Sequence, residues 1–265
     1  MLDRVSPREH RPRSGSSALP PTSPRRSAVP TVVLAHGAFA DASSWGGVIV
    51  ELQSAGTSVL APPNPLRSLD GDAAYIAERV RQIDGPVLLV GHSYGGAVIT
   101  VAGAAARNVV GLVYVAAFIP DEGESLAEIG APFPQSRLAQ VVRQNRFPLS
   151  GTSETAVELS IAPQEYPSFF LPGSPPGVAA AAAVSQRPLA ASALFVDKAS
   201  AAAWRTMPSW AIIAAGDESI HPDAQRFMAE RAAAQTIEVP GPHTVMVSEP
   251  ARVADHIRDA IRALR

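Results

Sequence analysis

Residues 91–95, Gly-His-Ser-Tyr-Gly, are the part of the sequence whose types and spacing point most directly to chemistry. They follow an apolar run at 86–90 and precede small and apolar residues that begin at Gly96. A Gly-x-Ser-x-Gly sequence between a buried strand and a helix is typical of a sharp turn that presents a nucleophilic serine above a sheet. Small residues flank the serine because the turn is strained and neighbouring elements pass close to it. We therefore predict that Ser93 is a nucleophile and not merely a helix-capping serine.

A serine hydroxyl is a weak nucleophile, and it needs a base that is itself oriented by an acid. Asp217 follows the apolar run 210–214, and His243 follows the run 236–239. The carboxyl ends of parallel strands meet at one edge of a sheet, where catalytic groups collect. The chain order Ser, Asp, His is also the one expected of this architecture. The sequence therefore predicts a triad of Ser93, His243 and Asp217.

Two other residues compete for these roles. Asp121 comes shortly after the predicted strand 109–115 and could supply the acid instead of Asp217. His221 lies four residues after Asp217 in the same loop, and we expect it to be exposed and therefore a poor base. The pattern favours Asp217 but leaves Asp121 open as the acid.

Attack on a carbonyl also needs two preorganised backbone donors for the oxyanion. The N–H of Tyr94, at the start of the predicted helix, is one candidate. The second is expected in the loop after the first strand, where Gly37 permits close approach and Ala38 supplies the N–H. We interpret His36 and His92 as structural histidines. The histidines show no metal-ligand spacing, so we expect no metal.

The surrounding pattern alternates short apolar strands with amphipathic helices. Strands are predicted at 31–35, 58–61, 87–90, 109–115, 210–214 and 236–239, and helices at 45–55, 72–83, 95–106, 222–233 and from Pro250 onward. This alternation indicates an α/β fold, a mostly parallel sheet with helices on both faces. It stops between 120 and 208, where no strand is evident and two helices are expected, at 177–184 and 197–204. We interpret residues 121–208 as an inserted, mostly helical cap.

Composition narrows the class of protein. The chain has 265 residues, 46% of them hydrophobic, no cysteine and a formal net charge of -2. We expect one domain at 31–265, no nucleic acid partner, no disulfide and no membrane span. Residues 1–30 carry six arginines, two acids and six prolines, and are predicted to be a disordered tail. We expect a cytoplasmic protein, although the arginine-rich segment leaves export open. A homodimer is also left open.

Three segments resemble a known family. Residues 36–45, 91–96 and 113–121 are similar to the α/β-hydrolase superfamily and, within it, to bacterial esterases related to plant salicylate-methyl-ester esterases and hydroxynitrile lyases. The resemblance implies a Ser-His-Asp triad, an oxyanion hole, a lid and no cofactor. Lyase members carry a lysine directly after the catalytic histidine, whereas Thr244 stands here. That departure argues against cyanohydrin cleavage.

The expected function is hydrolysis of a small to medium apolar carboxylic ester through an acyl-enzyme. Aromatic residues in the loop and the cap, Phe39, Phe169 and Phe170, are expected to line the substrate pocket. The same triad also serves amide and carbon–carbon hydrolases and lyases, which remain the alternative. A non-catalytic ligand-binding member would need a damaged triad, and this one is intact.

Overall fold

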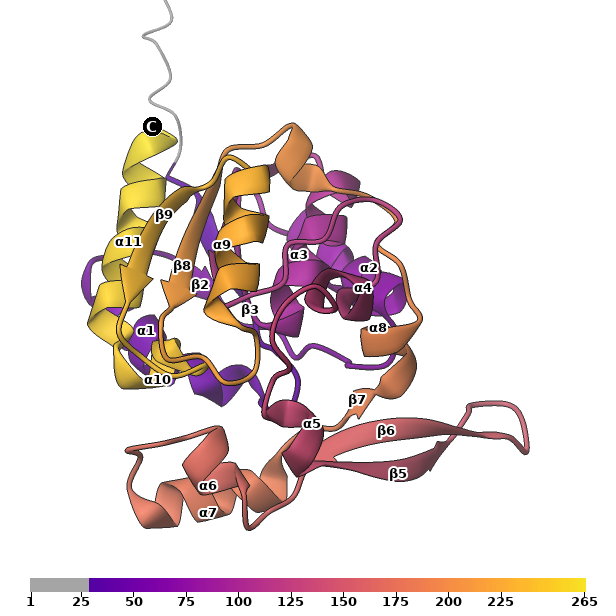
Figure 1. Ribbon diagram of the computed structural model, residues 1–265. Coiled ribbons are helices and arrows are strands. Elements are labelled where there is room, and N and C mark those ends of the chain that lie inside the picture. The colour runs from indigo at the N-terminus through magenta and orange to yellow at the C-terminus, as the bar shows by residue number, and fades with distance from the viewer. Residues whose placement is uncertain (1–28) are drawn as a thin grey trace, which may run out of the picture.

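The protein is built on one large parallel sheet. The computed structural model describes residues 29–265 (Figure 1). The sheet order is β2-β1-β3-β4-β8-β9, with every neighbouring pair parallel. The strands are β1 (Thr31–Ala35), β2 (Val59–Leu60), β3 (Val87–His92), β4 (Val109–Val115), β8 (Ser209–Ala214) and β9 (Gln235–Val239). The predicted fold class is confirmed, whereas the predicted tail lies outside the described residues except for its last two positions.

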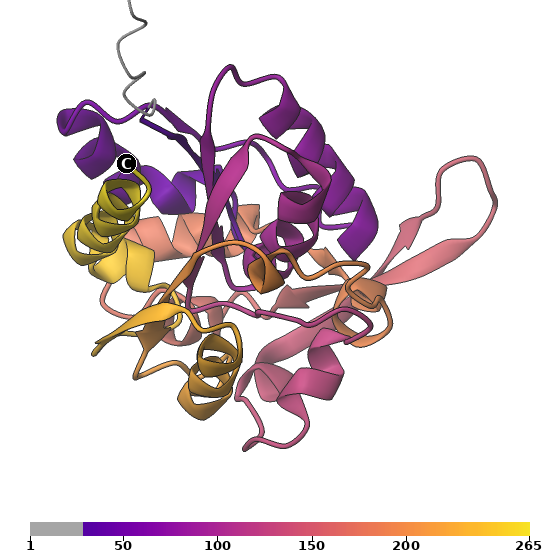
Figure 2. The ribbon, with the colours of Figure 1, turned by 90° about the horizontal axis from the view of Figure 1, so that it is seen from above.

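Helices cover both faces of this sheet (Figures 1 and 2). α1 (Gly46–Ser54) and α11 (Pro250–Ala263) pack against each other and close one face. α2 (Leu69–Arg81), α3 (Tyr94–Ala105) and α9 (Pro222–Arg231) contribute to the core on the other. All six residues of β3 are buried, as expected for a central strand covered on both sides.

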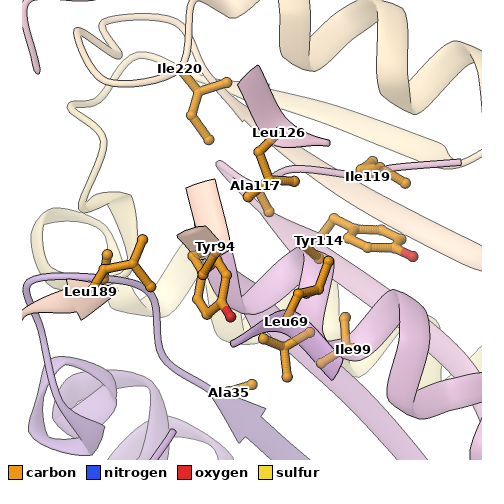
Figure 3. Packing of buried hydrophobic residues seen from close by; sticks show 14 of the residues in the cluster. Ala35, Leu69, Tyr94, Ile99, Tyr114, Ala117, Ile119, Leu126, Leu189 and Ile220 are labelled. Carbon is orange, nitrogen blue, oxygen red and sulfur yellow. The ribbon is translucent and has the colours of Figure 1, made fainter. Parts of the chain in front are cut away.

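Local sequence signals explain where these helices begin. The Ser68 side chain accepts a hydrogen bond from the Gly71 N–H and caps α2, with Asp70 and Asp72 in its first turn. Pro222 and Pro250 open α9 and α11, where a proline costs no helix hydrogen bond. Apolar side chains from the helices and strands then form two buried clusters, one on each face of the sheet. Figure 3 shows part of the larger one, in which Tyr94 and Tyr114 lie among aliphatic side chains.

The cap segment, residues 121–208, lies between β4 and β8 in the chain. Its helical elements are α4 (Leu126–Gly130), α5 (Leu138–Val141), α6 (Tyr166–Phe169), α7 (Pro176–Ser185), α8 (Ala191–Phe195) and a 3₁₀ turn, η2 (Ala203–Arg205). α5, α6 and α7 lie beyond the carboxyl ends of the main strands (Figure 1). The buried residues of α6 belong to the same apolar cluster as α2 and α3, so cap and sheet share one core.

The cap also contains strands, and the expectation that it has none was wrong. β5 (Val142–Pro148) and β6 (Thr155–Ile161) form an antiparallel hairpin that projects from the body, and β7 (Leu189–Ala190) extends it. β5 is mostly exposed and its sequence, VRQNRFP, lacks the apolar alternation of a half-buried strand. The helix expected at 197–204 is absent, and only the η2 turn forms there. Of the helices between residues 29 and 265, none combines the length and apolar character needed to cross a membrane.

Candidate active site

Ser93 occupies a strained turn between β3 and α3. Its backbone has φ 54° and ψ −122°, in the region that L-residues rarely adopt. A Cβ at Gly91 would collide with the Gly95 carbonyl, and one at Gly95 would collide with the Ala35 carbonyl of β1. The two glycines of the motif therefore let strand, turn and helix approach closely enough to hold the serine in this conformation.

His243 and Asp217 form a buried pair in the loops after β9 and β8. The His243 Nδ1 atom lies 2.7 Å from Asp217 Oδ2, and the two side chains are 3% and 0% exposed. Ser93 and His243 line one small cavity of about 40 Å³. No hydrogen bond joins the Ser93 hydroxyl to the imidazole in this conformation, and such contacts are often long without substrate. The structure thus brings the three predicted residues to one edge of the sheet.

The Asp217 carboxylate is held by four hydrogen bonds. Its Oδ1 accepts from the amides of Ser219 and Ile220, at 2.6 and 2.9 Å. Its Oδ2 accepts from His243 and from the Gln225 side-chain amide, both at 2.7 Å. A carboxylate fixed in this way presents one oxygen to the imidazole in a single orientation.

Gln225 is the residue of this site that the sequence analysis missed. It is 3% exposed, on the face of α9 that packs against the sheet. Besides Asp217, its side chain donates to the Ile220 carbonyl at 2.8 Å and accepts from the Ala214 N–H at 3.1 Å. The available signal was a polar residue on an otherwise apolar helix face, between Ala224 and Met228.

The backbone donors expected for an oxyanion also lie at the small cavity. Ala38 and Tyr94 both line it. A Cβ on Gly37 would come within 2.7 Å of the Ser93 Cβ, so this glycine permits the loop after β1 to reach the serine. The Tyr94 hydroxyl donates to Asp72 Oδ2 at 2.7 Å in the buried interior, which fixes the start of α3.

The two remaining buried histidines of the motifs bind backbone. His92 Nε2 lies 3.0 Å from the His243 carbonyl oxygen and tethers the loop that carries His243. His36 Nε2 accepts from the Asn64 N–H at 2.9 Å, while its Nδ1 lies 2.9 Å from the Gly37 carbonyl. Burial lowers the pKa of His36 to about 4, and burial together with the neighbouring His243 lowers the pKa of His92 well below its ordinary value. Both rings are therefore neutral at pH 7 and serve the loops that carry the site.

The competing candidates are occupied elsewhere. Asp121 pairs with Arg205 at 2.8 Å and lines neither the small cavity nor the larger one described below. His221 is half-buried rather than exposed, and it accepts from the Asp223 N–H at the start of α9. Across residues 29–265, no cluster of histidine and carboxylate side chains has a metal-binding arrangement.

The three aromatic residues expected to line the pocket are placed differently. Phe39 and Phe170 line the cavity of Ser93, and their ring centroids lie 6.2 Å apart in an edge-to-face arrangement. Phe169 lines neither cavity, and its ring packs beneath the Arg137 guanidinium.

Comparison with known proteins agrees with this architecture. A model of the alpha/beta hydrolase family matches residues 32–256. A carbendazim hydrolyzing esterase of Nocardioides sp. (strain SG-4G) is 36% identical over 107 residues, which are 36% of this chain and 44% of that protein. The match thus spans less than half the length of this curated relative.

Solved structures show the same fold at low identity. Polyneuridine aldehyde esterase superimposes with a TM-score of 0.74 at 19% identity, covering 88% of this chain and 99% of that one. A pyrethroid hydrolase from Sphingobium faniae JZ-2 gives 0.70 at 19% identity, with coverages of 89% and 98%. A methylesterase from Arabidopsis gives 0.69 at 19% identity, with coverages of 88% and 99%. With the family model spanning most of its length, the chain belongs to the alpha/beta hydrolase family.

Proposed function

We propose that the protein hydrolyses carboxylic esters, with Ser93 as nucleophile, His243 as base and Asp217 as the acid that orients it. The observation that carries the proposal is the buried His243–Asp217 hydrogen bond at the rim of the cavity that contains the strained Ser93. The esterase names of several similar proteins support the ester class.

The reaction follows from these positions. Ser93 Oγ attacks the ester carbonyl while its proton passes to His243 Nε2, and the amides of Ala38 and Tyr94 bind the oxyanion. The imidazolium then returns the proton to the departing alcohol, which leaves an acyl group on Ser93. A water molecule deprotonated by His243 attacks this acyl-enzyme and releases the carboxylic acid.

The cavity favours an apolar acyl group. Its walls include Phe118, Leu138, Leu189, Leu194 and Ile220, and no lysine, arginine, aspartate or glutamate side chain lines it. Burying a charged acyl group here would cost free energy that no neighbouring charge offsets. We therefore propose small neutral acyl groups.

The proposal is tested with p-nitrophenyl acetate. Ser93→Ala and His243→Ala should each lower kcat by ~10⁴-fold or more, and the double variant should be no slower, because the residues act as a unit. His221→Ala is the matched control and should retain activity. Multiplicative losses in the double variant, or wild-type rates in Ser93→Ala, would contradict the assignment.

A further inference from the structure

A second, larger cavity adjoins the catalytic one. It measures about 530 Å³ and lies between the loop after β1, helices α6 and α7 of the cap, and the loop that follows His243. Among residues 29–265, only Phe39 and Phe170 line both cavities. We call the two spaces the catalytic cavity and the outer cavity.

The two shared phenylalanines form a partition with a fixed backbone. The Tyr166 hydroxyl donates to the Phe39 carbonyl, and the Thr244 hydroxyl donates to the Phe170 carbonyl, both at 2.6 Å. These bonds tie the cap to the sheet on either side of the partition. The two rings meet edge to face, and the Phe170 ring also makes tilted contacts with the rings of Tyr166 and His243, at centroid distances of 5.0 and 5.9 Å. A substrate that spans both cavities must therefore displace these two buried rings, whereas the hydrogen-bonded backbone on either side holds its position.

Size requires a substrate to extend beyond the catalytic cavity. A space of about 40 Å³ holds a few water molecules, each of which needs roughly 10–15 Å³ of such volume. The outer cavity, at about 530 Å³, falls in the range of small-molecule sites, roughly 300–1,000 Å³. A medium-sized ester bound at Ser93 must therefore pass between Phe39 and Phe170 and place one of its halves in the outer cavity.

The position of the base decides which half that is. His243 must return its proton to the alcohol oxygen, so the alcohol half leaves on the side of the imidazole. Phe170 packs against this imidazole, and Thr244 and Val247, which follow His243 in the chain, line the outer cavity. Resting on the esterase function proposed above, we propose that the outer cavity binds a bulky, neutral alcohol half, while the acyl half is small and stays in the catalytic cavity.

The lining of the outer cavity indicates the chemistry of that alcohol. Tyr166, Leu171 and Val178 supply apolar walls that suit an aryl or alicyclic group. The Asp41 carboxylate also lines the cavity and accepts from the Ser43 amide and hydroxyl. Burial acts to raise the pKa of Asp41, but the hydrogen bonds from Ser43 together with the positive charge of Arg187 lower it overall, so Asp41 is negatively charged at pH 7. A negative wall disfavours anionic groups, which is why the alcohol half is neutral.

Two isomeric esters test the orientation. 2-Naphthylmethyl acetate places the naphthyl group on the alcohol, and methyl 2-naphthylacetate places it on the acid. We expect kcat/KM to be at least about tenfold higher for the first, a difference of the size that pocket contacts provide. A higher value for the methyl ester would overturn the proposed orientation.

Two alanines of α7 locate the site. Both Ala180 and Ala181 are exposed, but only Ala181 lines the outer cavity. Ala181→Phe should lower the ratio of kcat/KM for 2-naphthylmethyl acetate to kcat/KM for ethyl acetate about tenfold, and Ala180→Phe should leave this ratio unchanged. If Ala181→Phe leaves the naphthyl ester unaffected, or lowers both esters equally, the outer cavity is not the alcohol site.

A binding measurement separates this inference from the esterase proposal. If the wild-type protein hydrolyses ethyl acetate and p-nitrophenyl acetate no faster than Ser93→Ala, the proposed function is refuted. Calorimetric titration of Ser93→Ala with 2-naphthalenemethanol reports on the outer cavity without turnover. We expect binding that Ala181→Phe weakens about tenfold and Ala180→Phe does not, with no binding of 2-naphthylacetate. Absence of alcohol binding, or equal effects of the two substitutions, would overturn the cavity assignment.

Discussion

Gln225 offers the sharpest test of how the site is positioned, because it touches the proposed acid and lines neither cavity. Gln225→Met keeps an unbranched side chain of similar length and removes the donor to Asp217. A hydrogen bond to a charged group contributes about 1.5–3 kcal/mol. If the whole of this free energy stabilises the transition state, its loss should lower kcat roughly 10- to 150-fold, at about 1.36 kcal/mol for each factor of ten. KM should change little.

The same substitution should also destabilise the protein. The Ala214 N–H and the Ile220 carbonyl lose their Gln225 partner, at about 1–3 kcal/mol for each buried group left unpaired. A domain with ~5–15 kcal/mol of stability should still fold. Urea unfolding followed by circular dichroism measures this loss, and steady-state kinetics at about 15 °C, near maximum stability, measures kcat.

Met228→Ala controls for a loosened helix. Met228 is fully buried on the same face of α9, and its truncation should cost about 2–5 kcal/mol without touching Asp217. We expect its kcat to stay within a few-fold of wild type. If Met228→Ala loses as much kcat as Gln225→Met, then helix packing and not the hydrogen bond to Asp217 sets the activity. An unchanged kcat in Gln225→Met would refute the positioning role outright.

Two further predictions concern acid assignment and pH. Asp217→Asn should lower kcat about 10⁴-fold and Asp121→Asn less than tenfold, because of the two carboxylates only that of Asp217 contacts His243. A larger loss of kcat in Asp121→Asn than in Asp217→Asn would show that Asp121 is the acid. The pKa of His36 is about 4 in the folded protein and 6.5 in the unfolded chain. Its contribution to the free energy of unfolding is therefore complete above pH 6.5 and is lost as the pH falls toward 4. Between pH 7 and pH 5, the free energy of unfolding should fall by about 2 kcal/mol more in the wild type than in His36→Gln. An equal fall in the two proteins would contradict a buried, neutral His36.

The sheet was predictable because its signals are local. Each main strand is a short apolar run, and each helix on the sheet has either a capping residue, such as Ser68, or an apolar periodicity. The predicted helix at 95–106 and the observed α3, Tyr94–Ala105, differ by one residue at each end. β5 was missed because an exposed strand buries little and has no reason to alternate, whereas β6 does alternate at Val157, Leu159 and Ile161, a signal that the sequence analysis overlooked. Its pairing depends on partners 7 to 19 residues away in the chain.

The chemical groups of the site were predictable for a related reason. Ser93, Asp217 and His243 each follow a strand, and a parallel sheet brings such positions together whatever the loops contain. Gln225 was not predictable in the same way, because its role depends on which turn of α9 faces the loop after β8. A buried glutamine on an amphipathic helix indicates only that its side chain has some hydrogen-bond partner, and not which one.

The division of the pocket into two cavities is the part that no local pattern could show. It depends on Phe39 from the loop after β1 and on Phe170 from the cap, whose ring also meets His243 from the loop after β9. Phe39 and Phe170 are 131 positions apart in the chain, and Phe170 and His243 are 73 apart, so only the docking of the cap on the sheet joins them. The hydrogen bonds from Tyr166 to Phe39 and from Thr244 to Phe170 join the cap to the loops of the sheet at this same place. The cap therefore lines both the catalytic cavity and the outer cavity. On the proposed function, substrate selection therefore falls to the contact between cap and sheet, whereas the three residues proposed for the chemistry all follow strands of the main sheet.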